Sequence, residues 1–256
     1  MAVDLNQKLV ELARTRVLLV GSDYDGTLAP IADNPENACA IPSALSVLTK
    51  LTALPRTYVA VISGRTLADL RLRFKSSENI ELVGSHGAER EGAFGDSLDT
   101  DRLKIYAELV RVVNDAASLA SGSRVELKPF SVTFHYRQAT DDDALLALDS
   151  LIVRTAKIPQ ISPRQGKKAL EFSLVDVTKG DAFWTLRTKH DASAAIFVGD
   201  DLTDEDVFVR MGKDDLAVKV GPEESAASYR VLDPIAVAEM LERLLQLRAE
   251  AVKAMD

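Results

Sequence analysis

The sequence predicts an α/β protein with a doubly wound, mostly parallel sheet of the Rossmann-like type and an inserted α+β cap domain. Short apolar runs alternate with helical patterns toward both ends of the chain, as in sheets whose two faces are covered. The alternation stops near residue 99, where amphipathic helices and strands of alternating polarity take over. We therefore expect a core domain of residues 1–98 and 176–256, and a cap domain of residues 99–175.

The first core strand is expected at Val17–Val20, after an amphipathic helix within residues 1–16. Four consecutive aliphatic residues are typical of a strand buried on both faces. Asp23 and Asp25 follow directly, and ligands of open α/β sheets bind beyond the carboxyl ends of the strands. A calcium loop does not fit, because Gly26 stands fourth in the acidic stretch where that loop needs glycine at the sixth position.

Two more strands are expected before the cap, at Thr57–Ile62 and Ile80–Val83, with a helix at Pro42–Leu54 ahead of them. The strand Thr57–Ile62 ends in Ser63-Gly64-Arg65. A small hydroxyl and a glycine at a strand end suit a phosphate site made of side-chain and backbone donors. From this segment alone, Ser63 is equally well explained as a cap or turn residue.

The cap segment combines helices with extended stretches. Apolar residues have helical spacing over Leu103–Ala117 and Leu145–Ile152, and they alternate as in a strand over Val132–Tyr136. Another extended stretch is expected at Lys168–Leu174. Helices on one side of an antiparallel sheet leave the other face open, so this face is available to cover a ligand.

The last third returns to buried strands, expected at Ala194–Val198 and Leu216–Val220. Helices are expected at Thr178–His190, at Thr203–Met211 and around Val237–Leu244.

A second group of acids follows the strand Ala194–Val198: Asp200, Asp201 and Asp204. Two strands of one parallel sheet would bring these acids into one crevice with the pair after the first strand. Clustered carboxylates repel one another, and a bound divalent cation resolves the repulsion. All-oxygen ligands favour Mg²⁺, which commonly also binds a substrate phosphate.

Charge and composition exclude several classes of partner. The net charge of −8 argues against nucleic acid, whose phosphates are held by Lys and Arg. The single cysteine, Cys39, permits no internal disulfide and fits a reducing compartment. No stretch resembles a signal peptide or a membrane span, so a cytoplasmic protein is expected, and by default a monomer.

These residues together suit phosphoryl transfer. Asp23 would act as the nucleophile and form an aspartyl-phosphate, which splits one slow hydrolysis into two steps. Asp25 would protonate the leaving oxygen and later take a proton from the attacking water. Four residues are expected to bind the phosphate itself: Thr27, Ser63, Gly64 and Lys179.

The order of the motifs resembles the haloacid dehalogenase superfamily. Its four signatures match Asp23-x-Asp25-Gly26-Thr27, Ser63 after a strand, Lys179 at a helix start, and Gly199-Asp200-Asp201. The resemblance implies Asp23 as nucleophile, Asp25 as acid/base, and Mg²⁺ bound by Asp23, the Asp25 carbonyl and Asp200. It leaves open whether Asp201 or Asp204 contacts the metal directly or through water. The insertion matches the position of the superfamily's type-2 caps.

The flanking segments are similar to those of trehalose-6-phosphate phosphatases: DYDGTLAPI, VISGR, GSHGAE, VELKPFSVTFHYR, GKKALE, TKGDA and GDDLTDEDVF. The resemblance implies that Glu126, Lys128 and Glu171 contact the sugar. Carboxylates accept hydrogen bonds from sugar hydroxyls and Lys donates to them. Arg65 and His86 are expected to border the substrate, although His86 is equally compatible with a structural loop histidine.

The family resemblance implies a Mg²⁺-dependent phosphatase acting on trehalose 6-phosphate. The alternatives are a phosphatase of another sugar phosphate, of the sucrose or mannosyl-glycerate type, and a catalytically silent domain that binds a sugar phosphate. Cap opening and closing is expected about hinges near residues 95–101 and 175–179. Gly21-Ser22 replaces residues that are usually apolar in the family, so the end of the first strand is expected to be loosened.

Overall fold

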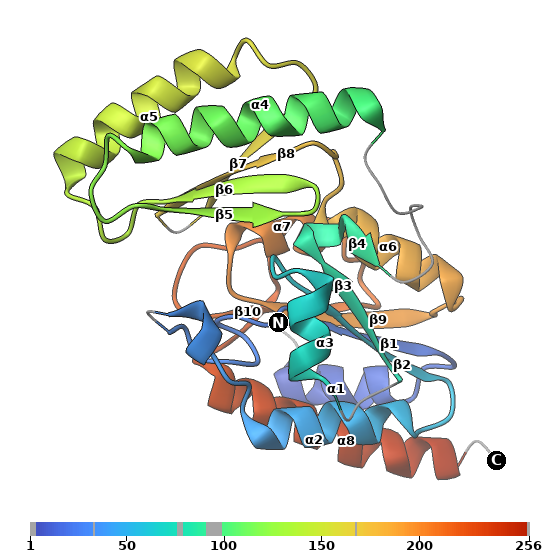
Figure 1. Cartoon of the computed structure of the whole chain (residues 1–256). Helices are drawn as coiled ribbons and strands as arrows, with labels where there is room; N and C mark the ends of the chain where they lie inside the picture. The colour runs from blue at the N-terminus through green and yellow to red at the C-terminus, as the bar shows by residue number, and fades with distance from the viewer. Residues whose placement is uncertain (1–3, 33, 76–78, 91–98, 167, 255–256) are drawn as a thin grey trace. The chain divides into compact units, whose positions relative to one another are not determined.

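The computed structural model describes residues 4–254, with gaps at 33, 76–78, 91–98 and 167. The chain forms two compact units (Figure 1). Unit 1 combines Met1–Glu91 with Thr178–Asp256, and unit 2 is Gly92–Val177. The first expected domain boundary and most of the hinge expected at 95–101 lie outside the described residues, so the domain limits and the cap motion stay predictions.

Unit 1 is built on a seven-stranded sheet in the order β11-β10-β9-β1-β2-β3-β4. All neighbours in it are parallel except β3 and β4. Its strands are β1 (Leu18–Ser22), β2 (Thr57–Ile62), β3 (Ile80–Gly84), β4 (Glu89–Arg90), β9 (Ala194–Gly199), β10 (Leu216–Val220) and β11 (Tyr229–Val231). The strand order reverses around β1, which confirms the predicted doubly wound α/β class.

Helices cover both faces of this sheet. Those of unit 1 are α1 (Leu5–Ala13), α2 (Pro42–Thr52), α3 (Leu67–Arg73), α6 (Lys179–Lys189), α7 (Leu202–Phe208) and α8 (Pro234–Lys253), with short 3₁₀ turns at Pro35–Asn37 and Ser85–Gly87. Apolar residues of α1, α2 and α8 pack in one cluster with alternate residues of β1 and β9, and α6 and α7 pack in a second cluster with the others. Unit 1 therefore has two apolar cores separated by its sheet.

The prediction of a loosened end for the first strand is wrong. Gly21 and Ser22 belong to β1, and both are buried. A Cβ atom on Gly21 would lie 2.7 Å from Cδ2 of Phe197 and closer still to the Phe183 ring. Two aromatic rings thus occupy the space beside Gly21, and they pack edge to face at 5.1 Å between centroids.

Arg248 on α8 fastens the last helix to the start of the chain. Its side chain is completely buried, and its guanidinium donates to the carbonyls of Ala13, Thr15 and Arg56 and to the hydroxyl of Thr57. A buried guanidinium is stable only when its donors are paired, and these acceptors supply the partners.

Unit 2 is a four-stranded antiparallel sheet in the order β5-β6-β8-β7, with two helices on one face (Figure 1). The elements are α4 (Thr100–Ala117), β5 (Arg124–Lys128), β6 (Ser131–His135), α5 (Asp141–Thr155), β7 (Ser162–Gly166) and β8 (Ala169–Ser173). Val132, Phe134, Leu170 and Phe172 point to the helices and form the core of the unit. The predicted α+β architecture of this segment is confirmed.

Among the described residues, no helix is both long and apolar enough to cross a membrane.

Candidate active site

The pairing of β1 with β9 brings two distant acids together. Ser22 pairs with Val198 in the parallel register, and the Asp23 N–H donates to the Val198 carbonyl at 2.9 Å. Asp23 and Asp200 therefore leave the sheet at neighbouring positions of the same edge. Gly26 follows in a turn at φ +76°, and a Cβ atom there would collide with the Asp200 carboxylate.

Three buried carboxylates form a cluster at this edge. Ligand oxygens of Asp23, Asp200 and Asp204 all lie within 4.8 Å of one another. Lys179 is 98% buried and pairs with two of them, at 3.0 Å from Asp23 Oδ1 and 2.8 Å from Asp204 Oδ1. One ammonium group thus faces three carboxylates.

Two capped helices hold this cluster. Thr178 caps α6 in a capping box with Asp181, which places Lys179 at the first position of the helix. Asp201 caps α7, and Asp204 closes that capping box by accepting the Asp201 N–H at 2.9 Å. Each oxygen of Asp204 therefore already accepts a hydrogen bond, one from Lys179 and one from the backbone.

The pKa shifts reflect the excess of negative charge. Burial raises the pKa of Asp23 well above its ordinary value; Lys179 opposes the shift, while Asp204 and Asp200 add to it. Burial alone would lower the pKa of Lys179, but the charges of Asp204 and Asp23 outweigh it and raise that pKa above the usual lysine range. Lys179 therefore stays charged, and its charge does not fully offset the burial of Asp23 and the repulsion from the neighbouring carboxylates.

A divalent cation fits this cluster. Buried carboxylates need compensating charge: Lys179 pairs with Asp23 and Asp204, the buried Lys219 ammonium contacts only the backbone carbonyl of Asp200 among the bonds described, and the pKa of Asp23 stays raised despite Lys179. The donors are all oxygens, which suits a hard cation. Because Asp204 is occupied by Lys179 and the α7 N-terminus, Asp23 and Asp200 are the members best suited to hold the ion.

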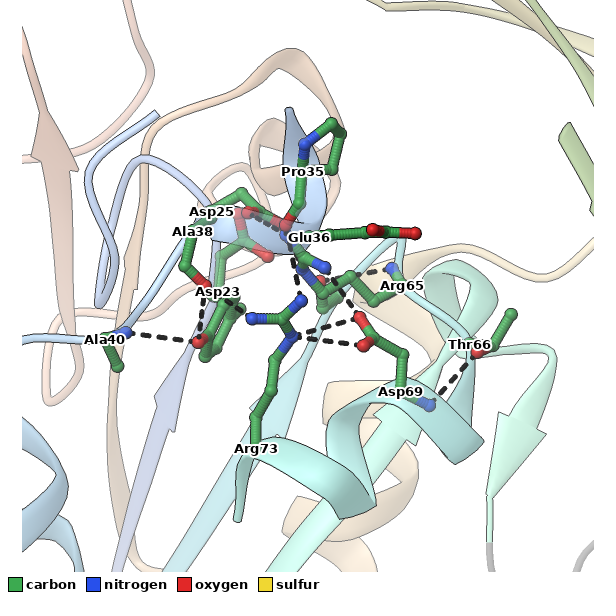
Figure 2. Close-up of polar contacts among 12 residues, drawn as sticks. Asp23, Asp25, Pro35, Glu36, Ala38, Ala40, Arg65, Thr66, Asp69 and Arg73 are labelled. Atoms are coloured by element: carbon green, nitrogen blue, oxygen red, sulfur yellow. Dashed lines mark hydrogen bonds and ion pairs between the residues drawn. The ribbon is translucent and has the colours of Figure 1, made fainter. Parts of the chain in front are cut away.

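Asp25 lies apart from the cluster, and its carboxylate is bound by Arg65 (Figure 2). Arg65 donates from Nε to Asp25 Oδ2 and from Nη2 to Asp25 Oδ1, both at 2.7 Å. The same guanidinium donates to Asp69 at 2.6 Å and to the Pro35 carbonyl at 2.7 Å. Arg65, which was predicted to contact substrate, is a fork that fixes the Asp25 side chain in this structure.

A second arginine supports this fork (Figure 2). Arg73 donates to Asp69 at 3.1 Å and to the Ala38 carbonyl. Burial raises the pKa of Asp69, but hydrogen bonds from Arg65 and Arg73 outweigh it and keep the net pKa below the ordinary value. The two arginines thus share one stable carboxylate, and Arg65 is held from both sides.

The predicted phosphate ligands lie near the carboxyl ends of β1 and β2. Ser63 is buried, and its Oγ accepts the Arg65 N–H at 3.2 Å. Thr27 is completely buried, and its Oγ1 has no hydrogen-bond partner among the described residues. Gly64 lies against the ring of His86, where a Cβ would be 2.6 Å from Cε1. An orphaned hydroxyl such as that of Thr27 is consistent with an absent ligand.

His86 occupies a strained position in the Ser85–Gly87 turn, with φ +55°. Its backbone N–H donates to the Ser63 carbonyl at 2.9 Å, which ties the turn to the end of β2. Non-glycine residues with positive φ are uncommon and concentrate at functional sites, so this geometry is compatible with both roles considered for His86.

The predicted sugar ligands form a separate group in unit 2. Lys128 Nζ lies 3.1 Å from Glu171 Oε1, which also accepts the Ser131 hydroxyl. Lys128 and Glu171 are each 7% exposed, so they are not solvated surface charges. Glu126 accepts a hydrogen bond from His135 Nε2 at 2.7 Å.

Neighbouring charges stabilise the ionised form of Glu126. Burial raises its pKa, but the His135 hydrogen bond and the charge of Lys128 more than offset burial, so the net pKa is lowered. His135 lies on β6, the strand that pairs with the strand of Glu126. Its contact with Glu126 joins two strand neighbours and was not visible without the β5–β6 register.

The sequence of the chain matches a known protein family. The sequence model described as Trehalose-phosphatase matches residues 22–235. The chain belongs to the trehalose-phosphatase family. This trehalose-phosphatase match spans every residue of the carboxylate cluster and all of unit 2, and it confirms the resemblance seen in the sequence.

The relatives of this trehalose-phosphatase family member are longer proteins than the chain itself. The chain is 34% identical over 252 residues to the trehalose-phosphate phosphatase of Mycobacterium tuberculosis, covering 91% of this chain and 62% of that protein. It is 33% identical over 276 residues to an uncharacterized glycosyl hydrolase of the same species, covering 100% of this chain and only 20% of that one. The chain thus spans about a fifth of the length of the latter relative.

A solved structure has the same fold. The C-terminal domain of Candida albicans trehalose-6-phosphate phosphatase superposes with a TM-score of 0.80 at 23% identity, covering 96% of this chain and 97% of that one.

Proposed function

We propose that this chain is a phosphatase that hydrolyses trehalose 6-phosphate to trehalose and phosphate. The observation that carries the proposal is the Asp23–Lys179–Asp204 arrangement with Asp200 alongside, in a chain whose family match covers residues 22–235. A buried carboxylate beside a fixed ammonium suits attack on a phosphate monoester, whose negative charge Lys179 would bind.

The reaction proceeds in two displacements. Asp23 attacks phosphorus through a carboxylate oxygen, forming a P–O bond as the bond to the sugar oxygen breaks, and Asp25 gives that oxygen a proton. Water then attacks the aspartyl-phosphate, Asp25 takes its proton, and phosphate leaves with Asp23 restored. Both Asp25 oxygens accept hydrogen bonds from Arg65 here, so at least one of these bonds opens before Asp25 donates.

Other residues of unit 1 position the phosphate. Lys179, Ser63 and the buried hydroxyl of Thr27 supply donors for its oxygens, with the backbone at Gly64. We propose Mg²⁺ as the cation, held by Asp23, Asp200 and the Asp25 carbonyl. When bound, it would supply positive charge beside the phosphoryl oxygens.

The polar residues of unit 2 would recognise the sugar. Glu126, Lys128 and Glu171 offer charged acceptors and a donor on one sheet face, and trehalose is a neutral molecule rich in hydroxyl groups. Lys128 and Glu171 offset each other in an ion pair, while Glu126 offers a carboxylate that can accept from sugar hydroxyls.

Phosphate release from a panel of sugar phosphates, with and without Mg²⁺, tests this proposal, using the native chain beside Asp23→Asn. We expect strong preference for trehalose 6-phosphate, lost on chelation and in the variant. Preference for a sucrose or mannosyl-glycerate phosphate would change the substrate. No release from any ester, with trehalose 6-phosphate still bound, would identify a silent binding domain.

A further inference from the structure

One buried hydroxyl at the centre of the unit 2 sheet makes no hydrogen bond. Thr133 on β6 is 4% exposed, and its Oγ1 has no partner among the described residues. Leaving a buried hydroxyl unsatisfied costs about 1–3 kcal/mol, so native structures rarely retain one without a reason.

The strand register fixes the surroundings of this hydroxyl. Thr133 pairs directly with Glu126 on β5 and with Glu171 on β8. Directly paired residues of antiparallel strands point to the same face, with Cβ atoms about 4.5–5.5 Å apart. Thr133 therefore lies between the two acids that are proposed to bind the sugar, on the face opposite α4 and α5.

Both neighbouring acids already have other donors. Glu126 accepts from His135 at 2.7 Å, and Glu171 accepts from Lys128 at 3.1 Å and from Ser131. These contacts cross the sheet on either side of Thr133 and leave its hydroxyl between two completed pairs. The hydroxyl can donate one hydrogen bond and accept two, and none of this capacity is used by the residues that the structure describes.

We propose that Thr133 is a specificity-determining residue that binds a hydroxyl group of the sugar part of the substrate. A sugar hydroxyl is itself a donor and an acceptor, so it can satisfy Thr133 and reach an adjacent carboxylate at the same time. The inference rests on the proposed function, and it adds to Glu126, Lys128 and Glu171 a neutral residue that sequence reasoning did not single out.

Replacing the hydroxyl by a methyl group tests the inference with little change of shape. Thr133→Val is expected to lower kcat/KM for trehalose 6-phosphate about 3- to 10-fold, the effect of one lost hydrogen bond. Hydrolysis of p-nitrophenyl phosphate, which has no sugar hydroxyl, is expected to stay at the native rate. The melting temperature of the unliganded variant should hold or rise, because an unsatisfied polar group has been removed.

Two further variants separate recognition from folding. Thr133→Ser keeps the hydroxyl and is expected to retain at least half of the native kcat/KM for trehalose 6-phosphate; should the valine variant not fold, the Ser and Ala variants carry the comparison. Thr155→Val is the matched control, a buried threonine of α5 whose hydroxyl already donates to the Leu151 carbonyl. It is expected to leave the preference between the two esters unchanged.

Equal losses on both esters, or no loss on trehalose 6-phosphate, would overturn the role of Thr133. If the native chain prefers a different sugar phosphate, the proposed substrate fails, and the same comparison on that ester decides the inference. Absence of any sugar-phosphate hydrolysis or binding by the native chain would overturn both.

Discussion

The two units hold buried charge in different ways. In unit 1, Lys179 pairs with Asp23 and Asp204 in a cluster of three buried carboxylates, whereas in unit 2 Glu171 pairs with Lys128 and Glu126 accepts a hydrogen bond from His135. Buried charges that are balanced within the chain need no ion, and buried charges in excess do. The comparison supports the proposed division of roles, with a cation at the unit 1 cluster and a neutral, hydroxyl-rich ligand on the unit 2 sheet.

Removing one ammonium from each unit gives the strongest test of this difference. Lys179→Met leaves Asp23 and Asp204 without their cation, so the free energy of unfolding without metal is expected to fall by about 3–5 kcal/mol. Lys128→Met leaves Glu171 with Ser131 and is expected to cost about 1–3 kcal/mol. Urea unfolding of both variants measures the two losses.

Metal should then act on one unit only. Mg²⁺ is expected to stabilise both variants through the unit 1 cluster, but to narrow the difference in stability from the native chain only in Lys179→Met. Equal losses in the two variants, or an equal narrowing of both differences by Mg²⁺, would remove the distinction between the units.

Chelation of the native chain tests the excess charge directly. Mg²⁺ at about 100 times its dissociation constant is expected to stabilise the fold by about 2.7 kcal/mol, seen as a melting temperature about 5–10 °C higher than in EDTA. Asp200→Asn should abolish most of this shift, whereas Glu171→Gln in unit 2 should keep it. A native shift that survives Asp200→Asn would place the ion elsewhere.

Replacing Arg65 tests its role in holding Asp25, and the effect on kcat should not depend on whether the substrate carries a sugar. Arg65→Lys cannot reproduce two parallel hydrogen bonds to Asp25, so kcat is expected to fall about 10- to 100-fold. The loss should be the same for trehalose 6-phosphate and p-nitrophenyl phosphate. Arg73→Lys is the matched control, since Arg73 donates to Asp69 and, among the hydrogen bonds described, not to Asp25. A loss confined to the sugar ester would return Arg65 to its predicted role in substrate contact.

The smallest expected effect depends on pH and concerns His135. In the native chain the His135 hydrogen bond helps to keep the pKa of Glu126 low, so the carboxylate persists as the pH falls. Without it the pKa rises, and Glu126 takes up a proton at a higher pH. His135→Gln is expected to raise KM for trehalose 6-phosphate about two- to fivefold at pH 5, with a smaller change at pH 8. A pH-independent change would contradict this account.

The sequence predicted the buried strands that consist mainly of apolar residues. β2 and β10 begin and end at the predicted residues. By contrast, β7 has the sequence SPRQG, with no aliphatic residue, and it exists because β8 offers a pairing edge. Gly21 was misjudged because the rings that fill its space come from α6 and β9, far along the chain.

In the candidate site, too, the sequence indicated some residues and gave no indication of others. The order of acids along the chain indicated Asp23 and Asp200, because parallel strands end at a common edge. The Arg65–Asp25 fork and the Glu126–His135 pair depend on where side chains meet across elements, which spacing along the chain does not encode. Thr133 gave no signal at all, since an alternating strand explains a threonine fully.

The β1–β9 seam has a consequence for synthesis of the chain. β1 pairs with β2 soon after both emerge from the ribosome, but β9 follows only after the whole of unit 2. Unit 2 can therefore complete its own sheet while β1 still exposes an open edge, since domains generally fold as units. Asp23 and Asp200 meet only when that edge closes. The nascent chain thus acquires its acidic cluster late, and a ribosome stalled before residue 194 would carry a completed unit 2 sheet while Asp23 and Asp200 are still apart.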